Sequence, residues 1–476
     1  MYDLNTLAPV PVPVPDPQSA TAAVSVASRL GEILGAANVF TDPADLSSFA
    51  IEGTVPAAVA RPRAAEEVAA LVKFAAAEKL AIVPCGARTK MSMGMPPRQY
   101  DIAVDMTRIN RILAYDPDDL TLSVEPGLPL RELAAALTQR HQFLPLAVPF
   151  FDRATIGGTI ASGVDSPLRQ FYGTARDYTL GMEFVTGDGA LVKSGGRVVK
   201  NVSGYDMHKL MIGSFGTLGI ITKINLRTFP LPEMTRTYLA TFDDAAGACE
   251  FRHAIARSFL RPQSLEIIAA GGAPSAAHLL APFASERDWC VVISVAGNAL
   301  VLGRSRRELE SMSRQGEHPA RDFTELAPAD ERKILPLLRE FPGGAPRSNL
   351  PSALLKISAL PSDLQVVAEA ISRLAAEQQV SWTLLMRGVG IVYLSLAAAD
   401  ASAESSLRLA AACDAISSRC NGRQWDSAAF LWRSRESGSK TNAWAPVRDD
   451  ISLIHRLKNT FDPANIFAPG RFVGGV

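Results

Sequence analysis

The sequence lacks the features that would assign it to nucleic acid, a metal cluster or a membrane. Lysine plus arginine and aspartate plus glutamate both number 48, so no net charge draws the chain to an anionic polymer. The five cysteines are scattered and form no CxxC pair, so the sequence supports neither an iron–sulfur site nor a zinc ribbon. No apolar run approaches the roughly 18 residues of a membrane span, and no secretion signal opens the chain. These absences favour a soluble protein of the cytoplasm without a nucleic-acid partner.

The length of 476 residues is enough for several domains. Proline occupies every second position from Pro9 to Pro17, which favours extended polyproline geometry and forbids helix. We therefore predict a disordered leader over residues 1–20, with docking on a partner as the alternative. Globular patterning begins near Thr21.

Helical spacing is found over residues 64–79, and strand-like runs follow at 81–84, 102–105, 111–115 and 121–125. Two apolar runs meeting at Gly187-Asp188-Gly189 predict a hairpin over 182–193. Proline-rich residues 227–232 mark a domain boundary. Beyond it we predict strands at 238–241, 264–269, 289–296, 353–359, 382–386 and 390–395. The helices predicted there are 245–257, 302–313, 361–377, 405–419 and 449–460.

The most informative segment is the run from Lys200 to Thr222, KNVSGYDMHKLMIGSFGTLGIIT. Its three glycines, Gly213, Gly216 and Gly219, stand at three-residue spacing directly before an apolar strand. Glycine tolerates positive φ and lets another group approach the backbone closely. The run predicts a loop shaped around a cofactor, with a tight turn before a buried strand as the alternative.

A second loop, Cys85 to Lys90, joins a flexible glycine to a hydroxyl and two cations. Amides and a hydroxyl would donate hydrogen bonds to a diphosphate, and Arg88 and Lys90 would offset its charge. The loop is neither a P-loop nor a Rossmann GxGxxG. Taken alone, it is equally consistent with a solvated surface turn.

A third loop, residues 154–163, contains two threonines, a serine and three glycines. Small residues permit a close backbone approach and offer many donors. The alternative is a buried turn packed tightly against a sheet.

Together with Tyr172–Asp177, YGTARD, these loops resemble the FAD-binding domain of the vanillyl-alcohol-oxidase/PCMH flavoproteins. Within that group the likeness is closest to the FAD-binding subunit of bacterial glycolate oxidase and to D-lactate dehydrogenases. It covers residues 60–231, and residues 457–471 match the family's C-terminal segment. The resemblance implies an α+β fold with a PCMH-type FAD-binding domain over 21–232. An α+β cap with a largely antiparallel sheet would follow over 233–440, and residues 441–476 would return to the FAD domain.

The resemblance also implies the cofactor site. The first loop would hold the pyrophosphate, the 154–163 loop would line the ribityl chain and isoalloxazine, and the glycine-rich run would contact the adenine side. The residues implied are Cys85, Gly86, Ala87, Arg88, Thr89, Lys90, Pro126, Gly127, Thr155, Gly157, Gly158, Ser162, Gly163, Gly219, Ile220 and Ile221. Two departures are Ala87, where a glycine is common, and Ala468, where the tail usually has asparagine.

Family members that bind flavin covalently use a histidine in the first loop. Arg88 occupies that place here, and no histidine occurs between Met1 and Arg140. Arginine cannot form the histidyl–flavin bond, so we predict non-covalent FAD.

No catalytic base is identified. The HxxHGDGN-type metal-binding motif of the D-lactate dehydrogenase relatives is absent, and we predict no metal site. His208 is a weak candidate base whose alternative role is a structural donor. Arg176 and Asp177 are expected to anchor the backbone, with a substrate role as the alternative. The same expectation and the same alternative apply to Tyr205 and Asp206. Lys200 and Asn201 are as consistent with facing the flavin ring as with facing away.

The resemblance implies a subunit that oxidises a 2-hydroxy acid, glycolate or D-lactate, and passes electrons through FAD to a second flavoprotein subunit and an iron–sulfur subunit. That complex would lie at the inner membrane through its partners. The alternatives are a stand-alone FAD-dependent hydroxy-acid or alcohol dehydrogenase or oxidase, and a flavin-holding scaffold without substrate chemistry.

Overall fold

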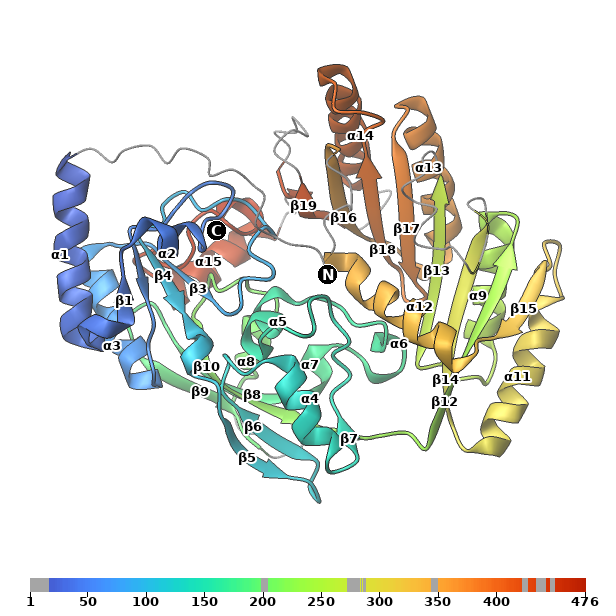
Figure 1. Cartoon of the computed structure of the whole chain (residues 1–476), viewed down its shortest axis with the longest axis horizontal. Coiled ribbons are helices and arrows are strands. Elements are labelled where there is room, and N and C mark those ends of the chain that lie inside the picture. Colours follow the sequence, from blue (N-terminus) through green and yellow to red (C-terminus); the bar gives the residue numbers. More distant parts are fainter. Residues whose placement is uncertain are drawn as a thin grey trace.

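A computed structural model describes residues 17–197, 204–271, 283, 285, 288–343, 350–421, 427–433, 442–445 and 450–476. Figure 1 shows two lobes: the N-terminal half with the C-terminal helix, and a second lobe built on a large sheet. No helix among the described residues is long and apolar enough to cross a lipid bilayer.

The first sheet of the N-terminal half has the strand order β1-β2-β4-β3. Its strands are Val39–Phe40, Ala58–Ala60, Ile102–Asp105 and Ile82–Cys85 in that order. β2, β4 and β3 are parallel, and β1 is antiparallel to β2. Helices α1 (Pro17–Leu34) and α3 (Ala65–Glu78) share a core with this sheet. α3 buries Val68, Leu71, Val72 and Ala75, which repeat at helical spacing.

The second sheet is antiparallel, in the order β5-β6-β10-β8-β9. Its strands are Ile112–Asp116, Thr121–Val124, Ile220–Arg227, Thr179–Val185 and Leu191–Gly195. The helices α4 (Leu130–Thr138), α5 (Ile156–Ser162) and α8 (His208–Met211) bury apolar side chains against it. Shorter elements are α2 (Pro43–Ser47), α6 (Arg169–Tyr172), α7 (Ala175–Tyr178), and the pair β7 (Gln142–Phe143) and β11 (Phe229–Pro230).

The second lobe contains a nine-stranded antiparallel sheet in the order β15-β12-β14-β13-β17-β18-β16-β19-β20. Its strands are Asp322–Glu325, Met234–Phe242, Trp289–Gly297, Ser264–Gly271, Ser381–Arg387, Ile391–Ala397, Ser352–Ser358, Ser427–Arg433 and Trp444–Ala445. Helices α9 (Ala245–Arg257), α11 (Ala299–Ser313), α13 (Leu364–Glu377) and α14 (Ala403–Asn421) cover one face (Figure 1). The α+β architecture and the antiparallel sheet are confirmed.

The other face of this sheet packs against the N-terminal half. Leu354, Leu385 and Tyr393 point to that face and share a core with Met93 and Val164 of the first lobe. Alternate residues of a strand point to opposite faces, so each strand serves both cores. Helix α12 (Pro328–Glu340) completes this layer.

The C-terminal segment returns to the first lobe. Helix α15 (Ile451–Phe461) is followed by a stretch that pairs with β3, since Ile82 N donates to Ile466 O at 2.8 Å and Ala468 N donates to Ile82 O at 2.9 Å. The chain leaves the five-stranded sheet at Arg227 and enters the nine-stranded sheet at Met234, where the sequence changes its pattern. The predicted assignment of residue ranges to domains stays a prediction.

Three expectations about elements need correction. Helix α1 begins at Pro17, so the last four residues of the predicted leader are helical; proline is tolerated in a first helical turn. Residues 1–16 lie outside the described residues. The predicted loop 154–163 contains helix α5. The elements α12 and β15 fall in a stretch for which we predicted no structure.

Candidate active site

A pocket of about 860 Å³, its open mouth included, lies where the three glycine-containing loops meet. We call it the loop pocket. Among the predicted cofactor residues, all but Gly127 and Gly163 line it. Further lining residues are Val83, Pro84, Met91, Met106, Ala161, Ser214, Phe215, Gly216 and Arg471.

Glycines stand at the points where these loops touch. A Cβ on Gly86 would lie 2.1 Å from Thr155 Oγ1, and one on Gly157 would lie 2.4 Å from Pro126 Cβ. Gly216 has φ +70°, and its Cβ would lie 2.6 Å from Pro84 Cγ. A side chain at any of them would force the loops apart, so the glycines fix the shape of the pocket.

Within the 154–163 segment, helix α5 is capped at both ends. Thr155 Oγ1 accepts a hydrogen bond from Gly158 N at 3.3 Å, and Gly163 ends the helix at φ +61°. Gly163 serves as this cap outside the pocket lining. Gly127 also lies outside, because its N donates to Ile109 O at 2.7 Å and it packs on the backbone of Met106.

Two non-glycine residues of the lining have left-handed backbone conformations, Arg88 at φ 60° and Phe215 at φ 56°. Such conformations cost energy and tend to occur where a site requires them. The Arg88 guanidinium stacks over the Phe49 ring at 4.2 Å from its centroid. Its charge is thereby held at the pocket wall.

Cys85 is the last residue of β3, and its buried thiol donates to Val104 O at 3.5 Å. Burial raises the pKa of the thiol far above its ordinary value. The sulfur is therefore neutral and turned toward the neighbouring strand, so this residue offers the pocket chiefly its backbone.

Arg471 is the principal lining residue that the sequence did not identify. Its side chain is 3% exposed, and Nη2 donates to Met91 O at 2.8 Å and Met93 O at 2.7 Å. Nη1 is buried and has no hydrogen-bond partner among the described residues. Burial lowers the pKa of Arg471 to about 10, so the guanidinium stays charged at neutral pH. A buried cation with an open N–H edge fits a cofactor that carries an anionic diphosphate.

A second pocket, of about 660 Å³ with its mouth, lies between the two lobes. We call it the interdomain pocket. It shares Thr89 and Lys90 with the loop pocket, and its lining is Thr89, Lys90, Ser92, Met93, Pro149, Phe150, Val164, Pro342, Gly343, Leu354 and Leu431. Apart from the first loop and Ser92 this lining is apolar, as in many small-molecule sites.

The histidine named as a weak candidate base lies away from both pockets. His208 is 1% exposed, and its Nδ1 lies 3.0 Å from Ser194 Oγ, which also accepts from the His208 backbone N. Burial lowers the pKa of the ring below its ordinary value. The structure does not bring His208 together with the predicted cofactor residues.

The remaining predicted polar residues serve the backbone or lie outside the pockets. Asp177 Oδ2 accepts from Thr174 N at 2.6 Å and completes a capping box for α7. Arg176 Nη1 donates to Lys209 O at 3.4 Å. Tyr205 is 88% exposed, and Asp206 lines neither pocket. Lys200 and Asn201 lie outside the described residues.

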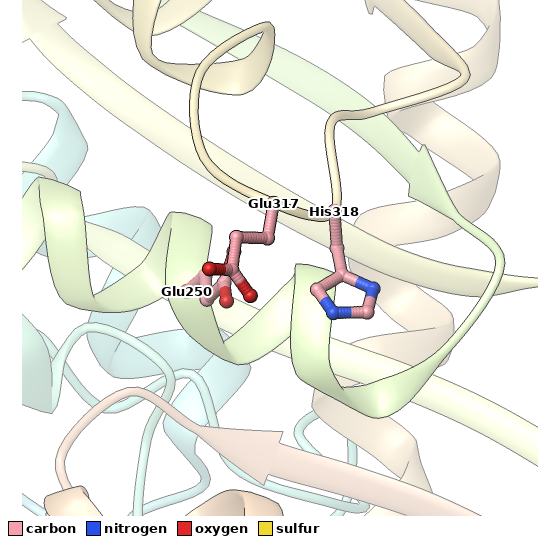
Figure 2. A group of neighbouring side chains, drawn as sticks. All are labelled: Glu250, Glu317 and His318. Carbon is pink, nitrogen blue, oxygen red and sulfur yellow. The ribbon is translucent and has the colours of Figure 1, made fainter.

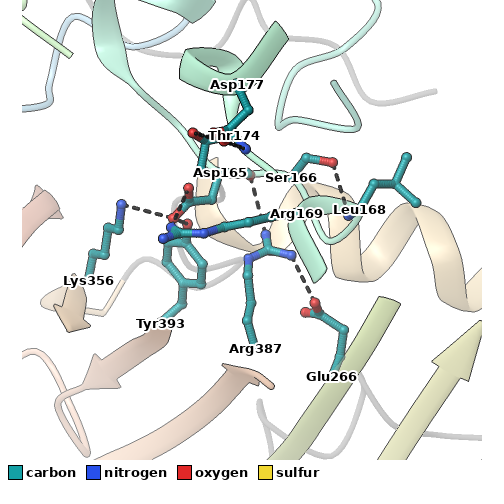
Figure 3. A network of polar contacts seen from close by, with 10 residues as sticks. All are labelled: Asp165, Ser166, Leu168, Arg169, Thr174, Asp177, Glu266, Lys356, Arg387 and Tyr393. Carbon is teal, nitrogen blue, oxygen red and sulfur yellow. Dashed lines mark hydrogen bonds and ion pairs between the residues drawn. The ribbon is translucent and has the colours of Figure 1, made fainter. Parts of the chain in front are cut away.

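Charged side chains from both lobes meet in one network (Figure 3), and its Asp165 directly follows Val164 of the interdomain pocket. Asp165, three residues after α5, lies 3.0 Å from Lys356 Nζ and 2.9 Å from Arg169 Nη1, and Arg387 Nη1 lies 2.9 Å from Glu266 Oε1. Tyr393 OH donates to Asp165 Oδ2 at 3.5 Å. We call these six residues the interdomain charge cluster: Asp165, Arg169, Glu266, Lys356, Arg387 and Tyr393.

The two carboxyl groups of the cluster titrate in opposite directions. Burial opposes the ionised form of Asp165, but Lys356 and two arginines outweigh it and hold its pKa below the ordinary value. Burial raises the pKa of Glu266 to about 7, although Arg387 acts against it. Oε2 of Glu266 has no hydrogen-bond partner among the described residues. The cluster therefore carries more positive than negative charge.

A separate group on the second lobe brings together Glu250 of α9 with Glu317 and His318 of the stretch before β15 (Figure 2). One ligand atom from each lies within 4.8 Å of the others. His318 Nδ1 already lies 3.0 Å from Asp244 Oδ2, and the group lines neither pocket. Exposed acidic groups often gather without a metal, and we assign no site to these residues.

Sequence reasoning missed Arg471 and the interdomain charge cluster for different reasons. Arg471 ends the segment 457–471 that resembles the family's C-terminal segment, so its position directly after Pro469-Gly470 was an available signal. Asp165 and Arg387 are 222 residues apart in the chain, and no local pattern connects them.

Comparisons with known proteins agree with this geometry. Residues 56–195 match the FAD binding domain family, and residues 444–472 match the family described as FAD linked oxidases, C-terminal domain. The first match contains the first loop and the 154–163 segment, and the second contains Arg471.

The chain is 28% identical to a D-2-hydroxyglutarate dehydrogenase of Xanthomonas citri pv. viticola, over 93% of this chain and 95% of that protein. It is 38% identical to the glycolate oxidase subunit GlcE of Escherichia coli, strain K12, over 34% of this chain and 46% of that subunit. The solved structure of p-cresol methylhydroxylase with substrate bound is similar at a TM-score of 0.73 and 18% identity, over 95% of this chain and 97% of that chain. This last likeness shows the fold. Residues 56–195 therefore form an FAD-binding domain, residues 444–472 resemble the C-terminal domain of FAD linked oxidases, and the whole chain has the fold of p-cresol methylhydroxylase.

Proposed function

We propose that the chain oxidises a small 2-hydroxy acid of the glycolate or D-lactate type to the 2-oxo acid, as one subunit of a larger complex. FAD would occupy the loop pocket, and the acid would occupy the interdomain pocket. The two relatives named above support this substrate class, because both of their names refer to 2-hydroxy acids.

One observation carries the proposal: Thr89 and Lys90 line both pockets. A substrate in the interdomain pocket would therefore lie next to the cofactor. When bound, FAD supplies a two-electron acceptor for the C–H bond of the hydroxy acid. The apolar side chains of Val164, Leu354 and Leu431 would exclude water from that bond.

The protein would hold FAD through three features. The small residues of the first loop and of α5 allow a close approach of the diphosphate and the ring system. Arg471 offers the open Nη1. The lining of the loop pocket contains no histidine or tyrosine among the described residues, and its cysteine is neutral and turned away, which supports non-covalent binding.

Electrons would leave through partner subunits, a second flavoprotein and an iron–sulfur protein. The support is the similarity to a glycolate oxidase subunit and the lack of any CxxC pair in the chain. The alignment with that subunit spans less than half of either chain, so the partners are part of the proposal.

A second candidate is a dehydrogenase that works without partner subunits. It is favoured by the similarity to a D-2-hydroxyglutarate dehydrogenase, which extends over nearly the whole of both chains. Both candidates use FAD and oxidise the C–H bond of a hydroxy acid, but they differ in substrate and electron acceptor.

The test is an anaerobic titration of the FAD-loaded chain with glycolate, D-lactate and D-2-hydroxyglutarate, followed by flavin absorbance. Bleaching by glycolate or D-lactate supports the proposal, and bleaching by D-2-hydroxyglutarate alone favours the second candidate. Re-oxidation by an artificial quinone without other subunits then favours the second candidate. A flavin that no 2-hydroxy acid bleaches, even with the partner subunits added, contradicts the proposal and leaves a flavin-holding scaffold. Acid precipitation tests how FAD is attached: release of all flavin is expected if the binding is non-covalent.

A further inference from the structure

Lys90 is the one cationic side chain among the described residues that line the interdomain pocket. It follows Thr89 at the end of the first loop, and its Nζ donates to Thr89 Oγ1 at 3.3 Å. No carboxylate of the described residues forms an ion pair with it. The ammonium thus has one weak partner, although we first assigned it to the cofactor's diphosphate.

The surroundings of Lys90 leave its charge poorly compensated. Met93, Phe150 and Val164 line the same pocket and offer it no acceptor. The acidic group that acts on it is Glu340 of α12, but the carboxylate of Glu340 accepts from Phe150 N at 2.6 Å and pairs with Arg339 at 2.9 Å. Burial lowers the pKa of Lys90 to about 8, and Glu340 raises it only in part.

A carboxylate that enters this pocket would meet a single opposite charge. A charge-assisted hydrogen bond in an apolar, water-poor pocket is roughly twice as strong as a neutral one. The same contact would relieve the desolvation of the ammonium, so ligand and lysine stabilise each other's charged forms.

We propose that Lys90 Nζ is the cation that binds the carboxylate of the acidic substrate in the interdomain pocket. The inference rests on the proposed function for the nature of the substrate, and it adds the residue that selects an acid over a neutral alcohol. Lys90 contributes binding and orientation. The hydroxyl proton and the C–H bond are handled by other groups.

This role has a consequence that a structural lysine would not show. With a pKa near 8 in the empty pocket, Lys90 is partly neutral above neutral pH, and a bound carboxylate raises its pKa. Carboxylate binding at about pH 8 must then take up roughly half a proton, and the affinity must fall up to tenfold for each pH unit above 8.

The experiment titrates the full FAD-loaded chain calorimetrically with pyruvate and with oxalate, which are unreactive toward oxidised flavin, in buffers of different ionisation enthalpy. Wild-type protein should show proton uptake at about pH 8 and little at about pH 6. Lys90→Met should weaken both ligands by roughly tenfold to a hundredfold and abolish the uptake. Lys90→Arg should keep the charge, bind at higher pH and take up no proton, since arginine does not titrate there.

Lys333→Met is the matched control, because Lys333 is an exposed lysine of α12 that lines neither pocket. It should bind both ligands as the wild type does. Flavin absorbance confirms the FAD load of each variant, and Lys90→Arg keeps the test decisive if Lys90→Met does not fold. Lys90→Met binding within twofold of wild type, or with unchanged proton uptake, overturns the inference.

The outcome separates this inference from the proposed function. Proton uptake that depends on Lys90, in a protein whose flavin no hydroxy acid bleaches, retains the carboxylate site and overturns the proposed oxidation. Bleaching that is equally fast and equally saturable in Lys90→Met retains the oxidation and overturns the role of Lys90.

Discussion

At the residue scale, Arg471 is a buried cation for which the described part of the chain provides no ion-pair partner within 4 Å. Two backbone carbonyls hold Nη2, and Nη1 is left buried at the wall of the loop pocket. An unpaired buried cation costs free energy unless a ligand supplies the missing acceptor. We therefore attribute part of the FAD affinity to this side chain.

Arg471→Met should raise the Kd for FAD by roughly tenfold to a hundredfold, the loss expected for a hydrogen bond to a charged group. Arg471→Lys should lose less, because it keeps the charge but not the planar fork. Arg236→Met, at an exposed arginine of β12, is the control and should leave the Kd unchanged. Flavin fluorescence quenching on titration of the apoprotein measures all three. Equal affinity of Arg471→Met and wild type would remove Arg471 from the site.

The buried carboxyl group of Glu266 should make the stability of the protein depend on pH. Burial raises its pKa from 4.5 to about 7, so the folded state binds more protons than the unfolded state between these values. Stability from this group is then present at low pH and is lost as pH rises from about 4.5 to about 7. The full change is about 3 kcal/mol.

Glu266→Gln should remove this dependence. The difference in free energy of unfolding between the variant and wild type should shift in favour of the variant as pH rises from about 5 to about 8. Urea unfolding at several pH values measures it. A constant difference across that range would show that Glu266 titrates as an ordinary carboxyl group.

At the element scale, helix α5 forms in a sequence with poor helix propensity. Two adjacent glycines stand in its first turn, each about 1 kcal/mol less favourable than alanine. Contacts with other segments compensate: Gly157 N donates to Pro126 O at 2.8 Å, and the missing Cβ lets the helix lie on that proline. Local patterning predicted a loop because it does not include this tertiary contact.

The neighbouring glycines give a matched pair of substitutions. Gly157→Ala should destabilise the apoprotein by about 2 kcal/mol or more, since its Cβ would lie 2.4 Å from Pro126 Cβ. Gly158→Ala should be neutral or slightly stabilising, because its Cβ would meet only Thr155 Oγ1 at 3.1 Å. Thermal unfolding of the apoprotein separates the two. Equal melting temperatures would mean that α5 can move away from Pro126.

At the scale of the whole molecule, the interdomain charge cluster joins the lobes at one aspartate. Asp165 comes from the segment between α5 and α6, and Lys356 from β16 of the second lobe. Val164, the residue before Asp165, lines the interdomain pocket. The ion pair therefore fixes one wall of that pocket as well as the position of the second lobe.

A double-mutant cycle with Asp165→Asn and Lys356→Met should give a coupling energy of about 1–3 kcal/mol, because the pair is largely buried. The exposed pair Arg304 and Glu308 of α11, treated in the same way, should give less than about 0.5 kcal/mol. Chemical unfolding followed by tryptophan fluorescence provides the free energies. Similar coupling in the two cycles would mean that the cluster does not hold the lobes together.

Much of this architecture could be predicted from local sequence. The predicted strand 102–105 and helix 245–257 have the same bounds as β4 and α9. The apolar periodicity of both segments and the N-cap Asp244 of the helix are local signals. Features built by tertiary contact could not be predicted in this way. Helix α5, the open edge of Arg471 and the meeting of Asp165 with Lys356 depend on segments far apart in the chain.

The cofactor loops show the same division. Their glycines and hydroxyls were recognisable, and the structure gathers them around one pocket. That Lys90 also faces a second pocket depends on Leu354 and Leu431 of the second lobe, which no spacing in the first half indicates.

The most direct measurement is the rate at which D-lactate or glycolate bleaches the flavin of wild type and of Val164→Phe under anaerobic conditions. The larger side chain would fill the interdomain pocket beside the cofactor while leaving the loop pocket intact. We predict that the variant keeps its oxidised-flavin band and its FAD affinity but bleaches at least about tenfold more slowly. A variant that bleaches as fast as wild type would contradict the account, because the substrate would then reach the flavin by another route.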